Sequence, residues 1–558
     1  MRIPLFKSYL MIRKILILFI TCLLGFTKSQ AQSNPSILPR PKLVVGIVID
    51  QMRWDYLYRY YNRYGDGGFK RLLTQGFSCE NTFINYLPSY TACGHATIFT
   101  ASVPSINGIT GNDWIDQQSG ETVYCTDDSS VRSVGIDESP DGKMSPKNLL
   151  VTTITDELRM ATNFQSRVVG ISLKDRAAIL PAGHTANAAY WLDDASGNFI
   201  SSTYYMNKLP DAVVDFNKQK NIDRLIQNDW NTLLPINAYL ESDSADRNYQ
   251  GKIPGESMSD FPHHIKSDYG SSRSVFRFTP FGNTLTLDFA KAMVEGYKLG
   301  QGAATDFLTI NCASTDYAGH LFGPTSIEME DVYLRLDQDL ASFFSMLDSK
   351  LGKDQYVVFL TADHGAADAV GYSKQHRIPA DYYYAKDLLS YLDQLITQKF
   401  GIAKAIRAGE NYQINFDLEK IRAAKADLDA IKTEVVNFLR KQAGVLYAVD
   451  LDKVQEASIP EPIKTMIING YNYKRSGQVQ IIFQTAWLES YAQKGTTHGT
   501  WNPYDTHIPL IFMGWGIHPG STVATVHMSD ITPTLSSLLH IQMPNGCIGT
   551  AIADVLKK

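Results

Sequence analysis

Five short, nearly continuous apolar segments constrain the fold of this chain more than any other feature. They occupy residues 43–50, 167–172, 306–311, 356–360 and 507–513. Strands that are covered by helices on both faces have this composition. Leucine and phenylalanine at helical spacing over 331–351 add a long helix between two of these segments. Strands alternating with helices predict an α/β fold, with a layered, mostly parallel sheet and helices on both of its faces.

Two long stretches lack these regularly recurring apolar segments. Residues 183–300 are rich in tyrosine, asparagine, aspartate and serine, and residues 372–490 contain a charged, helical middle part. We expect both to be insertions that form a cap over the carboxyl edge of the sheet, although part of the first could instead complete the sheet. The remainder of 32–558 is expected to be one catalytic domain.

The N-terminus has the features of a secretory signal peptide. Basic residues, Lys7 among them, precede an apolar run over 15–26, and small residues lead to a cleavage point after Ala31. The run is too short for a stable membrane span, and no second long apolar run follows. The weaker alternative is a lipoprotein anchor on Cys22, which the preceding Thr21 does not favour. We expect an exported protein, periplasmic or secreted, without a membrane span.

The charge and the cysteine content of the chain restrict which binding partners and disulfides are expected. The chain has 558 residues, 20% of them charged, with a formal net charge of -5. This balance offers no general attraction for nucleic acid, so a specific nucleic-acid partner is not expected. Five cysteines remain after residue 31, an odd and sparse set that permits one or two disulfides without defining their pairing. A monomer is expected rather than an obligate oligomer.

Acidic residues and histidines stand where the apolar segments end, or in short glycine-containing loops. Because ligands of open α/β sheets gather at the carboxyl edge, we expect these side chains to meet there. Asp316 and His320 would share one face if their segment is helical. Three carboxylates and three imidazoles suit a pair of catalytic divalent cations, for which zinc fits best, while ligand type alone leaves manganese and iron open. The candidate metal ligands are Asp50, Asp316, His320, Asp363, His364 and His498.

Thr91 is the candidate nucleophile. It lies in a turn that leads into a predicted helix, near the helix N-terminus, where backbone N–H groups and the helix dipole favour a phosphate. A nearby metal ion can activate a hydroxyl that is otherwise a poor nucleophile. The alternative is that Thr91 only caps the helix. Cys93 is expected to be a small packed residue, and His95 to pack beside the site.

Three further residues predict a cage for a phosphoryl group. Asn112 follows Thr91 in the sequence Gly-Asn-Asp-Trp, and Lys174 and Arg176 follow the segment over 167–172. In an extended segment, Lys174 and Arg176 would point to the same side. One amide, one ammonium and one guanidinium could hold three non-bridging oxygens, and two cations favour a dianionic monoester over a singly charged diester. The alternative is an ordinary solvated surface turn.

Taken together, these motifs resemble the alkaline phosphatase superfamily, in particular secreted bacterial alkaline phosphatases with a threonine nucleophile and an Asn/Lys/Arg cage. The resemblance extends from Asp50 to the C-terminal region and includes residues 505–514 and 530–535. It implies the alkaline phosphatase fold and the hydrolysis of phosphate monoesters through a phosphothreonine at Thr91. Asn112, Lys174 and Arg176 would bind the phosphoryl oxygens.

The resemblance also implies two zinc ions for each chain and no catalytic magnesium. One zinc ion would bind Asp316, His320 and His498. The other would bind Asp50, Asp363 and His364, and its open position would be taken by the hydroxyl of Thr91.

Other functions remain as alternatives. A nucleotide phosphodiesterase or pyrophosphatase of the same superfamily would share the metal ions, Thr91 and Asn112, so Lys174 and Arg176 are the discriminating residues. A sulfatase is disfavoured, because neither Ser89 nor Cys93 lies in a Cys/Ser-x-Pro-x-Arg motif. From a different class, the chain could be an exported, non-catalytic protein that binds a metal ion or phosphate, and a phosphotransferase is also conceivable.

Overall fold

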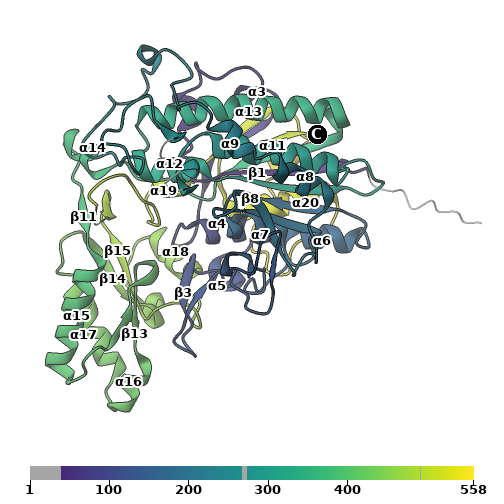
Figure 1. Ribbon diagram of the computed structural model, residues 1–558. Helices are drawn as coiled ribbons and strands as arrows, with labels where there is room; N and C mark the ends of the chain where they lie inside the picture. The colour runs from purple at the N-terminus through teal and green to yellow at the C-terminus, as the bar shows by residue number, and fades with distance from the viewer. Residues whose placement is uncertain (1–38, 267–272, 491, 558) are drawn as a thin grey trace, which may run out of the picture. The chain divides into compact units, whose positions relative to one another are not determined.

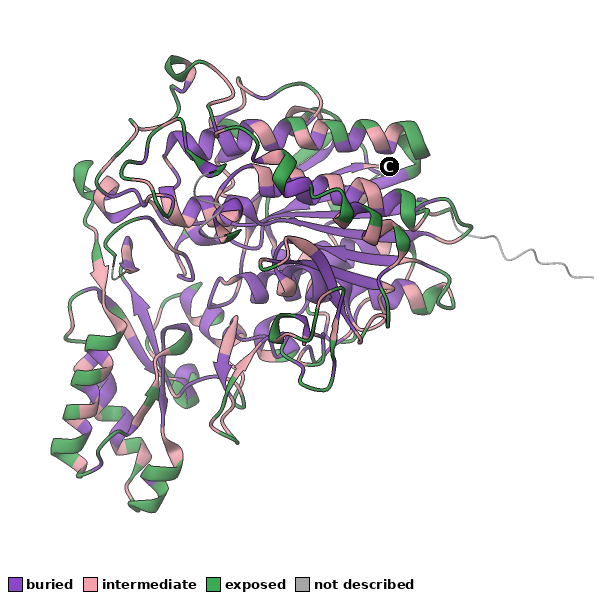
Figure 2. Cartoon of the chain, in the orientation of Figure 1, coloured by how far each residue is buried: buried purple, intermediate pink, exposed green. Residues whose placement is uncertain are grey.

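A mixed eleven-stranded sheet forms the centre of the protein in the computed structural model, which describes residues 39–266, 273–490 and 492–557. The expected signal peptide and Cys22 lie outside these residues. Figure 2 shows the central strands as almost entirely buried. Ten strands follow one another across the sheet: β17 (His507–Ile508), β2 (Phe77–Phe83), β18 (Leu510–Gly514), β10 (Tyr356–Thr361), β1 (Leu43–Ile49), β9 (Asp306–Cys312), β6 (Val168–Ile171), β7 (Ala188–Asp193), β8 (Asn198–Ser202) and β5 (Ser133–Val134), while β19 (Gly520–His527) pairs with β2.

The middle of the sheet is parallel. β1 pairs in parallel with both β9 and β10, and β6 pairs in parallel with β9 and β7. Antiparallel strands flank this part, since β18 runs against β10 and β8 runs against β7. Every residue of β1 is buried, as expected for a strand covered on both faces. The predicted α/β class is confirmed, with antiparallel strands toward both edges.

Helices cover both faces of the sheet (Figure 1). On one side, α4 (Thr91–Thr100) contacts α6 (Ile154–Ala161), α7 (Asp175–Ala182) and α20 (Ile531–Leu539). On the other side, α11 (Phe281–Gly296), α12 (Ser314–Phe322) and α13 (Ile327–Leu351) contact one another. α13 begins where the Ser326 side chain accepts a hydrogen bond from Met329 N, and it ends before Gly352, whose φ is 96°. The shorter elements of this part include α2 (Tyr56–Arg59), α3 (Phe69–Gln75), α5 (Pro104–Asn107), β3 (Asp113–Ile115), β4 (Thr122–Tyr124), α8 (Asp211–Lys218), α9 (Asn221–Leu225), α14 (Val370–Gln375), α19 (Pro503–Thr506) and α21 (Ala553–Leu556).

The first expected insertion, residues 183–300, is not a cap along its whole length. β7 and β8 extend the main sheet, and α11 packs beside α13 in the main core. The polar residues that suggested an insertion lie mainly between these elements, whereas all six residues of β7 are buried. β7 and β8 therefore complete the sheet, which is the alternative that the sequence left open for part of this range. Their apolar segments are too short to stand out in a polar surrounding.

The second expected insertion, residues 372–490, builds a small sheet of its own. Its strands follow the order β12 (Ile406–Ala408), β13 (Gln413–Phe416), β15 (Val479–Phe483) and β14 (Val445–Asp450). α15 (Ala385–Phe400) and α17 (Leu428–Leu439) supply apolar side chains to a core that is separate from the main one. We call this part the small-sheet region (Figure 1). It also contains η5 (Glu410–Tyr412), α16 (Leu418–Ala423), α18 (Ile463–Gly470), and the paired strands β11 (Asp381–Tyr383) and β16 (Trp487–Glu489).

Neither disulfides nor a membrane helix contribute to the described part of the chain. Cys79, Cys93, Cys125, Cys312 and Cys547 are all free thiols, so none of the permitted bridges forms among the described residues. Within the same residues, no helix has the combined length and hydrophobicity that crossing a bilayer requires.

A buried histidine stabilises the segment that packs against the start of α13. His263 has no exposed surface, its Nδ1 lies 2.8 Å from a Glu256 oxygen, and its Nε2 lies 3.5 Å from a Glu328 oxygen. Burial disfavours the charged ring, but the two carboxylates outweigh this effect and raise the pKa of His263 to about 9. The imidazolium is therefore the native form at neutral pH.

This raised pKa predicts a loss of stability at alkaline pH. Because the folded pKa lies above the unfolded value, the stabilisation is complete below pH 6.5 and is lost as the pH rises toward about 9. The shift corresponds to about 3 kcal/mol. Thermal unfolding followed by circular dichroism should show a falling unfolding temperature over this window in the wild type and a flatter profile in His263→Gln. Identical profiles would contradict the assignment.

Candidate metal centre and active site

The six candidate metal ligands meet at the carboxyl edge of the parallel strands. Asp50 follows β1 and Asp363 follows β10, while Asp316 and His320 lie one turn apart on α12, as expected. The ligand atoms form two overlapping groups that could each hold an ion: Asp50, Asp363 and His364, and Asp316, His364 and His498. His320 joins the second group through its Nε2, which lies 3.1 Å from an Asp316 oxygen. His364 thus stands between the two sets that the sequence separated.

Backbone carbonyls fix the orientation of the three histidines. The Nδ1 atoms of His320, His364 and His498 lie 2.8–2.9 Å from the carbonyl oxygens of Thr496, Gly365 and Ser89, respectively. A carbonyl oxygen can only accept a hydrogen bond, so each Nδ1 carries the ring proton and each Nε2 keeps a free lone pair. Metal-binding histidines are commonly held in this tautomer by such a partner.

Buried carboxylate oxygens without hydrogen bonds give a second indication of a cation site. Asp50 Oδ1 and Asp363 Oδ2 are buried and have no hydrogen-bond partner in the described part of the chain. Burial and the nearby Asp50 raise the pKa of Asp363 well above its usual range, and burial lowers the pKa of His364 to about 4. Such a cluster is costly without a counter-charge, so the chemistry of these residues fits divalent metal ions.

Lys174 bridges the two halves of this cluster. Its Nζ lies 2.9 Å from an Asp50 oxygen and 2.6 Å from an Asp316 oxygen, and it sits 5.0 Å from the centre of the Tyr317 ring. Burial opposes its charge, but Asp316 and Asp50 outweigh burial and raise the pKa of Lys174. Burial likewise opposes ionisation of Asp316, yet Lys174 and His320 hold the pKa of Asp316 well below its usual range. An ammonium has three donors, so one remains for another acceptor.

Thr91 stands at the first position of α4, as the sequence predicted. The residue that caps this helix is Tyr90, so Thr91 does not serve as the cap. Thr91 Oγ1 lies 3.3 Å from His364 Nε2, which places the hydroxyl at the metal groups. The close approach requires Gly94, since a Cβ there would lie 2.5 Å from the carbonyl oxygen of Asp363.

Two neighbours of Thr91 have packing roles. Cys93 is fully buried, and burial raises the pKa of its thiol, so a thiolate is not available at neutral pH. His95 Nδ1 contacts the carbonyl oxygen of Thr91 at 2.9 Å, and burial lowers the pKa of the ring to about 4. His95 also lies 3.4 Å from an Asp363 oxygen, so it packs directly beside the metal groups.

The three candidate phosphate-binding residues come from different local structures. Asn112 Oδ1 accepts a hydrogen bond from Ala92 N, directly after Thr91. Lys174 precedes α7 in an extended conformation, whereas Arg176 lies within the first turn of that helix. The expectation of one extended segment was therefore wrong. Lys174 and Arg176 still line one cavity of about 300 Å³, together with Tyr317.

Arg176 keeps one buried donor without a partner. Its NH1 group donates to the Tyr124 hydroxyl at 3.1 Å, and Tyr124 in turn donates to Asp175 at 2.9 Å. Its buried Nε–H finds no acceptor among the described residues. A guanidinium that is positioned in this way and still has a free donor is suited to bind an anion.

Sequence reasoning did not find the residues that hold this arrangement in place. Gln51 lies two residues after β1 and adopts a φ of 62°. Its side-chain amide donates to Asp316 at 2.7 Å, and its backbone N–H donates to Asp363 at 3.1 Å. Tyr124 was missed as the partner of Arg176. The only local signal for Gln51 is its position next to Asp50, and Tyr124 has none, because both roles depend on contacts between distant segments.

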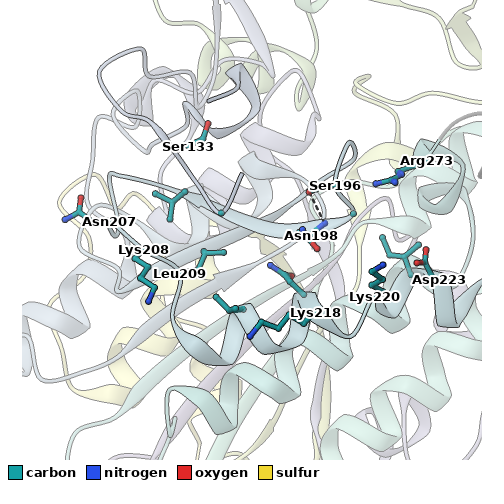
Figure 3. Close-up of a pocket in the computed structure, with 16 residues that line it drawn as sticks. Ser133, Ser196, Asn198, Asn207, Lys208, Leu209, Lys218, Lys220, Asp223 and Arg273 are labelled. Atoms are coloured by element: carbon teal, nitrogen blue, oxygen red, sulfur yellow. Dashed lines mark hydrogen bonds between the residues drawn. The ribbon is translucent and has the colours of Figure 1, made fainter. Parts of the chain in front are cut away.

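A larger cavity lies elsewhere on the protein. It has a volume of about 700 Å³ and is lined at the β5–β8 edge by residues that include Ser133, Asn198, Lys208 and Lys218 (Figure 3). None of its lining residues is a candidate metal ligand, and the lysines there stand apart from Thr91 in the fold. The site is therefore identified by the candidate metal ligands and Thr91, and not by the size of a cavity.

Comparisons with known proteins give a consistent family. The family model for type I phosphodiesterase / nucleotide pyrophosphatase matches residues 44–505. The chain is 51% identical to alkaline phosphatase PafA of Elizabethkingia meningoseptica, over 97% of this chain and 98% of that protein. It is 53% identical to alkaline phosphatase PhoV of Synechococcus elongatus, over 95% of this chain and 96% of that protein.

The PafA likeness extends to the fold. The crystal structure of wild-type PafA superposes with a TM-score of 0.92, at 52% identity, over 93% of this chain and all of that one. PafA has also been crystallised as a variant with substitutions at one threonine, one asparagine, one lysine and one arginine.

Proposed function

The chain belongs to the type I phosphodiesterase / nucleotide pyrophosphatase family, within the alkaline phosphatase superfamily, and we propose that it is an exported, zinc-dependent alkaline phosphatase that hydrolyses phosphate monoesters. One observation carries this proposal. The Thr91 hydroxyl stands at the N-terminus of α4 and lies 3.3 Å from His364, which belongs to both groups of buried carboxylates and imidazoles. A hydroxyl at such a place is set up to attack an anionic phosphorus centre.

Different residues of the chain have different roles in the proposed phosphoryl transfer. Two zinc ions would bind Asp50, Asp363 and His364 on one side and Asp316, His320 and His498 on the other. When bound, they supply charge neutralisation, activation of a hydroxyl and stabilisation of a leaving oxygen. Thr91 Oγ forms a bond to phosphorus while the bond to the leaving oxygen breaks. In the net step the Thr91 proton passes to that oxygen, and the leaving group departs as an alcohol or phenol. Water then cleaves the phosphothreonine and releases phosphate, which restores the Thr91 hydroxyl.

The cage favours a monoester over a diester. A monoester has three non-bridging oxygens and about two negative charges, while a diester has two such oxygens and one charge. Asn112, the third donor of Lys174 and the free Nε–H of Arg176 would provide one contact to each oxygen of the monoester. The four positions altered in the PafA variant have the same residue types and the same spacing as Thr91, Asn112, Lys174 and Arg176, which supports treating them as one functional set.

A nucleotide phosphodiesterase is the second candidate, because the matched family is named for that activity. It would use the same metal ligands and Thr91. The cationic side chains of Lys174 and Arg176 near the nucleophile favour the monoesterase. The similarity to two alkaline phosphatases over nearly the whole chain favours it as well. Export is part of the proposal because the sequence begins with signal-peptide features.

Metal removal tests the proposed chemistry. Protein stripped with a chelator should lose at least about 100-fold in monoesterase activity and regain it with Zn²⁺, at about two zinc ions for each chain by elemental analysis. Zinc should also raise the unfolding temperature, because the ions bind only the folded state. His263→Gln, which alters a buried histidine outside the site, should bind the same amount of zinc. Full activity in stripped protein would refute the metal assignment.

A further inference from the structure

A third cavity lies next to the proposed nucleophile, Thr91. It has a volume of about 490 Å³, and its walls come from both the main domain and the small-sheet region. On the main-domain side it is lined by Tyr90, Asn112 and Asp113. Tyr90 directly precedes Thr91, and Asn112 holds the first turn of α4. A group attached to a phosphate at Thr91 therefore reaches this space when it extends past Asn112 and Tyr90.

The small-sheet region supplies the opposite wall through η5 and the ends of α15 and β16. Asn411 and Tyr412 have φ values of 60° and 57°, a conformation that bulky residues rarely adopt. Contacts with the main domain hold this turn in place. Asn411 donates to the Asp113 carbonyl at 2.9 Å, and the Tyr412 hydroxyl donates to the His498 carbonyl at 3.2 Å. The wall is thus fixed against the residues that flank the metal groups.

The lining of this cavity carries more negative than positive charge. Asp113, Glu410 and Glu489 line it, and Lys386 is the only basic residue in its lining. In the described part of the chain, none of the three carboxylates takes part in an ion pair or a side-chain hydrogen bond. Burial raises the pKa of each carboxyl group, and repulsion adds to this effect, from Asp113 on Glu410 and from Glu410 on Glu489. At alkaline pH the three groups are ionised and their fields add.

We propose that this cavity receives the leaving group of the phosphate ester, and that Glu410 and Glu489 select against leaving groups that carry a negative charge. The inference rests on the proposed monoesterase function and names its substrate class. The favoured substrates are phosphate monoesters of uncharged or amine-bearing alcohols and phenols. Esters whose leaving group bears a carboxylate or a second phosphate are disfavoured, because their negative charge and those of the two glutamates repel each other. The aromatic faces of Tyr90 and Tyr412 give the uncharged part of the leaving group a surface to contact.

A pair of nearly isosteric substrates tests this selection. We would measure kcat/KM at pH 8 and low ionic strength for 4-carbamoylphenyl phosphate and 4-carboxyphenyl phosphate, using the zinc-loaded, full-length protein. For each variant we would divide kcat/KM for the neutral ester by kcat/KM for the anionic ester and compare this neutral-to-anionic ratio with that of the wild type. The intrinsic reactivities of the two esters then cancel. In the double variant Glu410→Gln/Glu489→Gln we expect the ratio to fall by about tenfold, while kcat/KM for the neutral ester changes by less than about twofold. Glu489→Gln should account for most of the change, because Glu410 is more exposed and its field is more strongly screened.

Two further variants give matched controls. Glu419→Gln removes a carboxylate from an exposed position on α16 outside the cavity lining, and it should leave the ratio unchanged. Lys386→Gln removes the positive charge from the cavity lining and should raise the ratio. Added salt should lower the ratio in the wild type and have less effect in the double variant. An equal ratio in the double variant and in Glu419→Gln would overturn the inference.

The neutral substrate separates this inference from the function on which it rests. If the wild type hydrolyses the neutral ester but the ratio does not respond to Glu410 and Glu489, the monoesterase assignment stands and the selection by charge is refuted. If the wild type releases no phosphate from either ester, the proposed function fails, and the inference fails with it.

Discussion

Thr91→Ala should abolish multiple-turnover hydrolysis of phosphate monoesters, with a loss in kcat/KM of at least about 10⁴-fold. The methyl side chain cannot form a covalent bond to phosphorus, while the rest of the site stays in place. Thr91→Ser retains a hydroxyl at the start of α4 and should keep substantial activity. Steady-state release of phosphate from an aryl phosphate measures the loss.

A trapping experiment assigns the loss to the covalent step. Acid quenching of the wild type with radiolabelled substrate should leave label on the protein, and peptide mapping should locate it at Thr91. The Thr91→Ala protein should carry none. Cys93→Ala is the matched control, because Cys93 is buried two positions away and contributes packing alone, so its label and turnover should persist. Turnover near the wild-type level in metal-loaded Thr91→Ala would exclude Thr91 as the nucleophile.

Arg176→Ala should reduce kcat/KM for a monoester by about 10³-fold and reduce diesterase activity far less. In the proposed cage the guanidinium would contact an oxygen whose charge is present in the monoester dianion, and a diester replaces that oxygen with an alkoxy group. Parallel assays with a matched aryl monoester and diester measure the two losses. Equal losses would show that Arg176 does not discriminate between the two classes.

A milder variant separates the presence of the guanidinium from its position. Tyr124→Phe removes the hydroxyl that accepts a hydrogen bond from Arg176 NH1 and leaves the charge intact. We expect a loss of about tenfold on the monoester and little change on the diester. Wild-type monoesterase activity in Tyr124→Phe would mean that packing alone positions Arg176.

The sequence predicted the central sheet because its strands are short, apolar and buried on both faces, as β1 and β10 illustrate. The same pattern located the candidate metal ligands, since Asp50 comes directly after β1 and Asp363 comes two residues after β10. Asp316 and His320 share one face because their segment is helical, which was the condition attached to their spacing of four residues. These features could be predicted because they depend on short, local stretches of sequence.

Features that depend on contacts between distant segments were not predictable in this way. β7 and β8 are short and lie in a polar region, so their place in the main sheet becomes visible only through their pairing with β6 and with each other. Lys174 and Arg176 were expected on one extended segment, yet a helix begins between them. The role of Gln51 arises from side chains more than 260 positions away.

The most direct test of the account is the ratio of kcat/KM for a matched aryl phosphate monoester and diester, measured with purified, zinc-loaded protein near pH 8. We expect a strong preference for the monoester, because Asn112, Lys174 and Arg176 would hold three charged oxygens next to Thr91. A preference for the diester would leave the metal ligands and Thr91 in their assigned roles, but it would contradict the phosphate cage and favour the phosphodiesterase alternative.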